Sequence, residues 1–304
     1  MTPLTTTDDA GTAQPQDRRP GSLGDVKGWF RHADIVLFDW FLSRQDRLEQ
    51  HGDVLEMGAY MGKSAIFLQS YLRPGERLTV CDLFDGEAPD NPNAREMQKS
   101  YSTLTRRAFE ANFRAFHEEL PRIIHGPTSW VPDEVEDGSC RFVHVDASHL
   151  YEHVRGDIVA ARAALGEEGV VVLDDYRAHH TPGVACAAWE AVVTGGLKPV
   201  CLTATKFYGT WGDVASIQDE LLATLGERTD CWVGAEEIAG GRVLRVNADR
   251  VPSPRMPRSR FAGEQRERRS PGGGGAGRAP ASRGRKLAKD LLPPVVTRAL
   301  RGLK

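Results

Sequence analysis

Acidic residues follow two strand-like runs of this chain, and their arrangement could hold a metal ion. Asp146 comes directly after residues 141–145, and Asp174 and Asp175 come directly after the apolar run at 169–173. If the two runs are neighbouring strands of one sheet, the three carboxylates meet at its edge and repel one another. A bound cation would stabilise them, and an all-oxygen ligand set favours Mg²⁺, Mn²⁺ or Ca²⁺ over zinc. A plain helix-capping role for the acidic pair stays open.

A histidine stands three residues after the first of these acids, where a helix is expected to begin. With an ordinary pKa near ~6.5, His149 could accept the proton of a hydroxyl group at neutral pH. Proton removal of this kind typically contributes ~10²–10⁴-fold to a rate. A capping or packing role for His149 stays open. His144 is expected to be structural, and His179 and His180 are expected to lie in a solvated loop, where contact with a substrate is the alternative.

A glycine-containing turn follows the strand expected at residues 53–57. Residues 56–64 read E-M-G-A-Y-M-G-K-S, and the final G-K-S matches the end of a phosphate-binding P-loop. A P-loop needs four residues between its glycines, whereas three separate Gly58 from Gly62. Tyr60 stands where the dinucleotide fingerprint G-x-G-x-x-G needs its second glycine to admit a pyrophosphate. The turn therefore predicts a ligand without a pyrophosphate.

An α/β scaffold must position these side chains. Alternation of strands and helices at this spacing predicts a doubly wound, Rossmann-like, mostly parallel sheet of seven strands, with an antiparallel last strand and helices on both faces. Ligands of such sheets bind at the carboxyl ends of the strands. We expect strands at 53–57, 77–81, 122–125, 141–145, 169–173, 199–203 and 206–211, helices at 62–72, 102–117, 151–165 and 183–193, and a polar loop through Asp85, Pro89 and Pro92.

The glycine turn resembles motif I of class I S-adenosylmethionine-dependent methyltransferases, whose loop wraps the methionine moiety of the cofactor. Asp82 matches the acid that ends the second strand in that family and holds the ribose hydroxyls, and a carboxylate is well suited to accept from two neighbouring hydroxyls. Residues 125–129 resemble the loop that flanks the adenine. The resemblance implies these cofactor-binding residues: Glu56, Gly58, Tyr60, Gly62, Ser64, Asp82 and Ser129. A turn or capping role for Asp82 stays open.

Two further motifs narrow the resemblance to one branch of that family. Residues 142–152 read F-V-H-V-D-A-S-H-L-Y-E, and residues 169–176 read G-V-V-V-L-D-D-Y. The pair resembles the macrocin O-methyltransferase and cephalosporin hydroxylase-like branch, over about residues 28–211. The resemblance implies a divalent metal, Mg²⁺ first among the candidates, on Asp146, Asp174 and Asp175, with Asp146 and His149 as the catalytic residues and His149 as the general base.

These observations predict a metal-assisted, S-adenosylmethionine-dependent O-methyltransferase acting on a hydroxyl of a sugar or another small hydroxylated metabolite, in natural product or glycan modification. Two alternatives stay open: a metal-independent class I methyltransferase acting on nitrogen or oxygen, and a scaffold protein with this fold but without catalysis. We expect the acceptor site to be shaped by residues 85–101, the loop after Asp175 and residues 212–241.

Composition divides the 304-residue chain, 40% of which is hydrophobic, into four parts. We expect a disordered N-terminal segment at 1–22, the methyltransferase domain at 23–247, a Pro/Gly/Arg-rich linker at 248–285 and a basic amphipathic tail at 286–304. From Arg250 onward, 15 lysines and arginines stand against three acidic residues, so the remainder of the chain is acidic. The acidic body predicts no nucleic-acid partner. The tail could contact an anionic membrane, although a solvated tail is the alternative.

The expected compartment is the cytoplasm, with peripheral membrane contact through the tail as an open addition. Residues 1–20 lack the apolar segment of a signal peptide, and no run approaches the ~20 apolar residues of a membrane span. The five cysteines are scattered and read as small core residues in a reducing compartment. Aromatic residues within 28–48 suggest a lid or a subunit contact, and with it a homo-oligomer.

Overall fold

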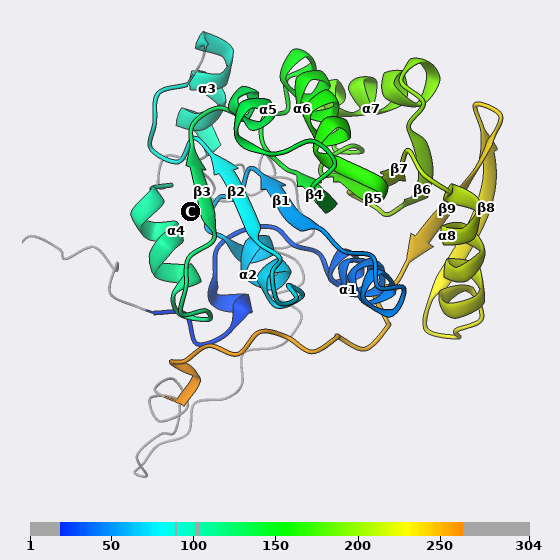
Figure 1. Ribbon diagram of the computed structural model, residues 1–304, viewed down its shortest axis with the longest axis horizontal. Coiled ribbons are helices and arrows are strands. Elements are labelled where there is room, and N and C mark those ends of the chain that lie inside the picture. Colours follow the sequence, from blue (N-terminus) through cyan, green and yellow to red (C-terminus); the bar gives the residue numbers. More distant parts are fainter. Residues whose placement is uncertain (1–18, 89, 101–103, 264–304) are drawn as a thin grey trace, which may run out of the picture. The chain divides into compact units, whose positions relative to one another are not determined.

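The computed structural model describes residues 19–88, 90–100 and 104–263 (Figure 1). Most of the N-terminal segment expected at 1–22 and all of the tail expected at 286–304 lie outside the described residues. The described residues form one sheet with strand order β3-β2-β1-β4-β5-β7-β6-β9-β8 and helices on both of its faces. The doubly wound α/β architecture predicted from the sequence is confirmed.

The parallel half of the sheet is built from five strands, of which the edge strand β3 is the most exposed. Their apolar side chains face helices on both sides, as expected of a parallel sheet. Each runs parallel to its neighbours. The strands are β1 (Asp53–Met57), β2 (Leu78–Asp82), β3 (Arg122–His125), β4 (Cys140–Val145) and β5 (Leu165–Leu173). β7 (Phe207–Thr210) runs antiparallel between β5 and β6 (Lys198–Leu202), which confirms the expected antiparallel last strand and hairpin.

The sheet has nine strands rather than the seven expected. β8 (Trp232–Ile238) and β9 (Gly241–Asn247) form a hairpin whose turn residues Ala239 and Gly240 have φ of 53° and 75°. Positive φ at both turn residues matches the twist of a tight hairpin. β9 then pairs parallel with β6, which extends the sheet beyond its expected edge. The hairpin, together with α8 (Val214–Leu221) and the π-helical turn η3 (Leu222–Gly226), accounts for most of the segment 212–241.

Two apolar clusters attach the helices to opposite faces of the sheet. One cluster joins α1 (His32–Arg47), α2 (Lys63–Gln69), α4 (Arg106–Phe113) and α8 to one face. The other joins α5 (Val131–Glu134), α6 (Tyr151–Ala164) and α7 (Pro182–Thr194) to the other face (Figure 1). Two 3₁₀ turns, η1 (Leu23–Asp25) and η2 (Thr128–Trp130), complete the described elements.

One helix occupies the segment that the sequence predicted to be a polar loop. α3 (Asn91–Ser100) includes Pro92, which was expected to lie in that loop. Proline is well tolerated in the first helical turn, where its missing N–H has no partner in any case. Asp90 Oδ1 accepts a hydrogen bond from Asn93 N (2.8 Å), as an N-capping residue does. The proline therefore starts this helix instead of preventing it.

The aromatic residues of the segment 28–48 are mainly core residues. Phe38 and Phe41 are fully buried, so they do not form the exposed aromatic surface expected for a lid or a subunit contact. Trp29 differs from them, because 73% of its surface is exposed, and its ring stacks on that of Tyr60 with 5.7 Å between ring centroids. Only this tryptophan keeps the exposed character that the sequence suggested.

The chain stays packed beyond residue 247, where the sequence predicted that a linker begins. Val251 is buried, and its carbonyl oxygen lies 2.6 Å from His32 Nε2. Ser259 is also buried and donates a hydrogen bond to the carbonyl oxygen of Pro20 (2.5 Å). The residues up to 263 therefore belong to the folded body.

The cysteines and the helices bear on the predictions about redox state and membranes. All five cysteines are free thiols, and Cys81, Cys140 and Cys201 are buried. These three match the expected role as small core residues, whereas Cys186 is exposed and Cys231 is partly exposed. Among the described residues, no helix is long and apolar enough to cross a membrane.

Candidate active site

Backbone hydrogen bonds fix the loops that leave the carboxyl ends of the parallel strands. Asp146 N donates to Met57 O (2.7 Å), and Asp174 N donates to Val145 O (2.9 Å). Gly58 N donates to Cys81 O (2.8 Å) in the same way. Each loop is thus attached to the end of the neighbouring strand. The candidate side chains of three loops meet at one edge of the sheet, where ligands of this architecture bind.

Gly58 allows the glycine turn to lie directly against the end of β4. Its φ is 81°, and a Cβ atom at this position would lie 2.1 Å from the carbonyl oxygen of Asp146 and 2.6 Å from Ala147 Cα. Only glycine has both the conformation and the absent side chain that this contact requires. The first motif of the sequence is therefore in direct contact with the acidic motif.

Asp82 holds the glycine turn in place. Its Oδ2 accepts from the backbone N–H groups of Ala59 (2.7 Å) and Tyr60 (3.0 Å), and its Oδ1 accepts from that of Phe84 (2.6 Å). Burial raises the pKa of Asp82, while these three N–H groups act in the opposite direction. The turn role left open in the sequence analysis is thus present. It leaves acceptor capacity on the same carboxylate, because each carboxylate oxygen can accept two hydrogen bonds.

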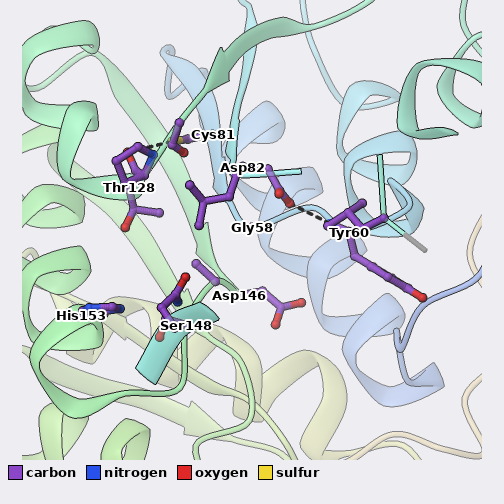
Figure 2. A pocket seen from close by; sticks show the side chains of 14 residues that line it. Gly58, Tyr60, Cys81, Asp82, Thr128, Asp146, Ser148 and His153 are labelled. Atoms are coloured by element: carbon purple, nitrogen blue, oxygen red, sulfur yellow. Dashed lines mark hydrogen bonds between the residues drawn. The ribbon is translucent and has the colours of Figure 1, made fainter. Parts of the chain in front are cut away.

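A first pocket lies at the ends of β1 to β4 and is called the cofactor pocket below. Figure 2 shows Gly58 and Tyr60 of the glycine turn, Asp82 at the end of β2, Thr128 of the loop after β3 and Asp146 at the end of β4 around it. Leucine, proline and cysteine side chains complete the wall. Such a mostly apolar cavity with a few fixed polar groups suits a ligand that is part aromatic ring and part polar chain.

Some residues expected at the cofactor lie elsewhere. Glu56 is fully buried beneath the pocket, because its side chain points to the face of the sheet that carries His144, its neighbour in register. Ser129 is exposed, and Thr128 lines the cofactor pocket in its place. Ser64 lines the second pocket described below, and Gly62 caps α2 with φ of 88°. Three of the seven expected residues, Gly58, Tyr60 and Asp82, line the cofactor pocket.

Two of the three expected metal ligands converge. Ligand atoms of Asp146, Asp174 and His144 all lie within 4.8 Å of one another. Burial and the neighbouring carboxylate of Asp174 raise the pKa of Asp146 well above its usual range. Carboxylates that repel each other in this way are stabilised by a cation, so the oxygen donors fit a hard divalent ion.

Lys206, which the sequence analysis did not identify, already brings one positive charge into this cluster. The residue precedes β7 and is fully buried. Its Nζ forms an ion pair with Asp174 and lies 3.0 Å from His144 Nε2. Burial acts to lower the pKa of Lys206, but the carboxylates of Asp174 and Asp146 outweigh it and raise the pKa. The only sequence feature that could have indicated this role is a single lysine directly before an aromatic strand.

The Lys206 contact also fixes the protonation of His144. An ammonium group can only donate, so His144 Nε2 accepts and the proton of the neutral ring lies on Nδ1. Nδ1 then donates to Glu56 Oε1 at 2.7 Å. Burial, followed by the charge of Lys206, lowers the pKa of His144 well below its usual range, so the ring stays neutral. Both ring nitrogens have partners within the protein, as expected of a structural histidine.

Asp175 faces the histidine of the second motif. Its Oδ2 lies 3.4 Å from His149 Nε2, and this histidine is the main cause of its lowered pKa. Asp175 has φ of 55°, and Tyr60 and Phe84 also have positive φ beside the site. Strained backbone of this kind persists where the surroundings hold it, often at functional sites. Asp175 is thus placed to orient His149.

A second pocket of about 920 Å³, called the acceptor pocket below, adjoins the first. Tyr60 and Asp146 line both pockets, so the two pockets share part of their walls. Asp174, Asp175 and His149 also line the acceptor pocket. Its volume is at the upper end of the range found for small-molecule sites. Residues 212–241, which were expected to shape the acceptor site, line neither pocket.

Comparison with known proteins finds a family model that matches part of the chain. Residues 55–176 match the family model described as a methyltransferase domain. This segment is less than half of the chain, and it runs from β1 to the loop after β5. It contains the glycine turn and all three acids of the cluster. No curated protein sequence matches the chain.

Solved structures are similar to this chain, and the first described here shares its fold. The O-methyltransferase NovP is 19% identical, with a TM-score of 0.50 over 59% of this chain and 79% of its own. CalS11, a TDP-rhamnose 3'-O-methyltransferase of calicheamicin biosynthesis, is 20% identical, with a TM-score of 0.40 over 59% of this chain and 80% of its own. MycE, a methyltransferase of the mycinamycin pathway in complex with Mg and SAH, is 17% identical, with a TM-score of 0.40 over 65% and 56%.

Proposed function

We propose that this chain contains a class I S-adenosylmethionine-dependent methyltransferase domain, and that it methylates a hydroxyl oxygen of a sugar or another small hydroxylated metabolite with the help of a divalent cation. The observation that carries the proposal is the pair of adjoining pockets that share Tyr60 and Asp146. A cofactor in the first pocket and an acceptor in the second would meet at the acidic cluster. Methyl transfer requires this kind of close alignment.

The cofactor half of the proposal depends on Asp82 and the glycine turn. Asp82 would accept hydrogen bonds from the ribose hydroxyls while its backbone contacts keep the turn closed. The loop from Gly126 to Thr128 would flank the adenine, because it lines the same pocket beside the end of β2. Gly58 keeps the glycine turn against the end of β4 and lines the pocket that would hold the methionine part.

The cation would be held by Asp146, Asp174 and Asp175. The convergence of Asp146 and Asp174, together with the raised pKa of Asp146, supports this assignment. When bound, a divalent cation lowers the pKa of a hydroxyl and orients it. Lys206 pairs with the carboxylate of Asp174 and offsets its negative charge. The cluster would therefore present a smaller negative charge to the ion.

His149 would take the proton of the acceptor hydroxyl. With S-adenosylmethionine in the cofactor pocket, this oxygen would accept the methyl group as its bond to sulfur breaks, and neutral S-adenosylhomocysteine would leave. Asp175 beside His149 would stabilise the imidazolium that forms, as a carboxylate partner does for other catalytic histidines. Charge is lost from both reacting groups, so a site shielded from water favours the transfer.

A binding measurement tests the cofactor assignment. S-adenosylhomocysteine is titrated calorimetrically into the full chain, with and without Mg²⁺, beside an Asp82→Ala variant. We expect binding that the variant loses, because Asp82 both lines the pocket and holds the turn. Absence of binding by the unmodified chain under both conditions would overturn the proposal and favour a scaffold protein.

A metal-independent methyltransferase is the second candidate, and the buried ammonium of Lys206 in the acidic cluster favours it. This ion pair could supply the charge that the divalent cation supplies in the first candidate. The two are separated by titrating Mn²⁺ into the protein and detecting the bound ion by electron paramagnetic resonance. Binding that Asp146→Asn abolishes supports the metal-assisted candidate, whereas no bound Mn²⁺ supports the metal-independent one.

A further inference from the structure

Exposed cations surround the mouth of the acceptor pocket. Lys27 and Arg31 come from the segment before and at the start of α1, and Arg177 comes from the loop after β5. All three side chains are exposed, whereas the acids that line the same pocket are buried or half-buried. The pocket thus has an acidic interior and a basic rim, which we define as Lys27, Arg31 and Arg177.

Within the described part of the chain, the rim cations have no acidic partners. Among residues 19–88, 90–100 and 104–263, none of the three forms an ion pair with a carboxylate. The contrast with the interior is direct, since Asp174 is paired with Lys206 and Asp175 faces His149. Lys63, a fourth lining cation, already donates to the carbonyl oxygen of Gly28 (2.8 Å).

The pocket is also larger than a single hydroxylated ring needs. Its volume of about 920 Å³ leaves room between the acidic cluster and the rim for an acceptor with two parts. One part would present the hydroxyl to His149 at the interior. Arginine pairs readily with phosphate or carboxylate in two-pronged hydrogen bonds, so the other part would be anionic.

We propose that the acceptor carries a phosphate or carboxylate group remote from the methylated hydroxyl, and that Lys27, Arg31 and Arg177 bind this group. The inference rests on the proposed methyltransferase function and adds the chemical class of its substrate. The rim would select anionic acceptors and hold the anionic end at the mouth of the pocket, which fixes the direction in which the acceptor enters.

The test uses the full chain saturated with S-adenosylhomocysteine, so that the carboxylate of the cofactor is already bound. Inorganic pyrophosphate and succinate are titrated separately at constant ionic strength with EDTA present, because pyrophosphate binds divalent ions. Three proteins are compared: the unmodified chain, Arg31→Gln/Arg177→Gln, and the control Arg107→Gln/Arg228→Gln. The control removes two exposed arginines that line neither pocket.

We expect anion binding that weakens about tenfold in the rim variant and stays unchanged in the control, as loss of charged hydrogen bonds predicts. Tighter binding of pyrophosphate identifies the anionic group as phosphate, and tighter binding of succinate identifies it as carboxylate. The inference is overturned if neither anion binds, if all three proteins bind alike, or if the rim variant loses affinity for S-adenosylhomocysteine instead. Failure of the unmodified chain to bind S-adenosylhomocysteine rejects the proposed function itself.

Discussion

The cofactor pocket and the acceptor pocket are held together by different kinds of contact. In the cofactor pocket, backbone groups fix the polar side chain, since three N–H groups of nearby turns donate to Asp82. In the acceptor pocket, charged side chains fix one another, as in the pair of Lys206 with Asp174. In the first arrangement, the side chains of the three donating residues can change, because only their backbone N–H groups contact Asp82. The second depends on every charge in it, because an unpaired buried charge is costly.

The buried acid at the start of α1 shows the same dependence. Asp34 accepts hydrogen bonds from the hydroxyl groups of Thr203, Thr205 and Tyr208, each at 2.8 Å. Burial raises the pKa of Asp34, and the charge of Lys206 is the largest opposing influence. The α1 segment, the β6–β7 turn and the acidic cluster are therefore coupled through one ammonium group.

Replacing the proposed base is expected to have the largest effect and to separate the two pockets most clearly. His149→Ala should lower the rate of methyl transfer by ~10²–10⁴-fold, because no group remains to take the hydroxyl proton. Affinity for S-adenosylhomocysteine should stay unchanged, since His149 does not line the cofactor pocket. The rate is measured as tritium transfer from labelled S-adenosylmethionine to an acceptor found by screening hydroxylated anions. His51→Ala, at an exposed residue before β1, is the control, and equal rates in both variants would exclude His149 as the base.

Removing the buried ammonium tests whether charge pairing holds the acceptor pocket together. Lys206→Met should lower the free energy of unfolding by about 3–5 kcal/mol, because it leaves Asp174 buried without its partner. Urea denaturation measures the change, with the exposed Lys198→Met as control. Mg²⁺ should stabilise the Lys206 variant more than the unmodified chain, since a divalent ion can replace the lost charge. Equal stabilisation of both proteins would count against a cation site at Asp146 and Asp174.

Adding a methyl group at Gly58 tests the contact between the glycine turn and the end of β4. Gly58→Ala should cost about 1–3 kcal/mol more than Gly75→Ala and should weaken binding of S-adenosylhomocysteine. Both glycines have positive φ, 81° and 91°, so the backbone strain is matched. Only at Gly58 does the new Cβ meet other atoms, whereas nothing lies within 4 Å at Gly75. Equal losses of stability in the two variants would show that the turn can move away from Asp146.

The sequence predicts the parallel core and the edge that carries the site because both follow from local patterns. Asp82, Asp146 and Asp174 each stand at or directly after the end of a strand-like run, and parallel strands bring such positions together. The outer hairpin β8–β9 escapes prediction because both faces of β8 are largely exposed, so its sequence lacks the apolar alternation of a buried strand.

The part of the site that the sequence does not reveal depends on contacts distant in the chain. Lys206 lies 62 residues from His144, and Asp34 lies 169 residues from Thr203, so no local spacing connects them. Glu56 differs from these residues, because its position in the glycine motif suggested contact with the cofactor. The alternation of side chains along β1 instead directs it to the buried face of the sheet that carries His144. Motif spacing locates loops, while strand pairing decides which side chains reach the pocket.

The smallest expected effect is the change in the free energy of unfolding per pH unit. It concerns Glu56, which is buried beneath the pockets. Burial raises the pKa of Glu56 from 4.5 to about 8, so the folded protein holds a proton that the unfolded chain releases near its ordinary pKa. The stability from this group is complete below about pH 4.5 and is lost as the pH rises toward about 8, by roughly 1 kcal/mol per pH unit. Glu56→Gln keeps an oxygen to accept the proton of His144 Nδ1 and should flatten this slope. Urea denaturation between about pH 5 and pH 8, with the exposed Glu119→Gln as control, measures it. Parallel curves for the two variants would mean that Glu56 is ionised in the folded protein.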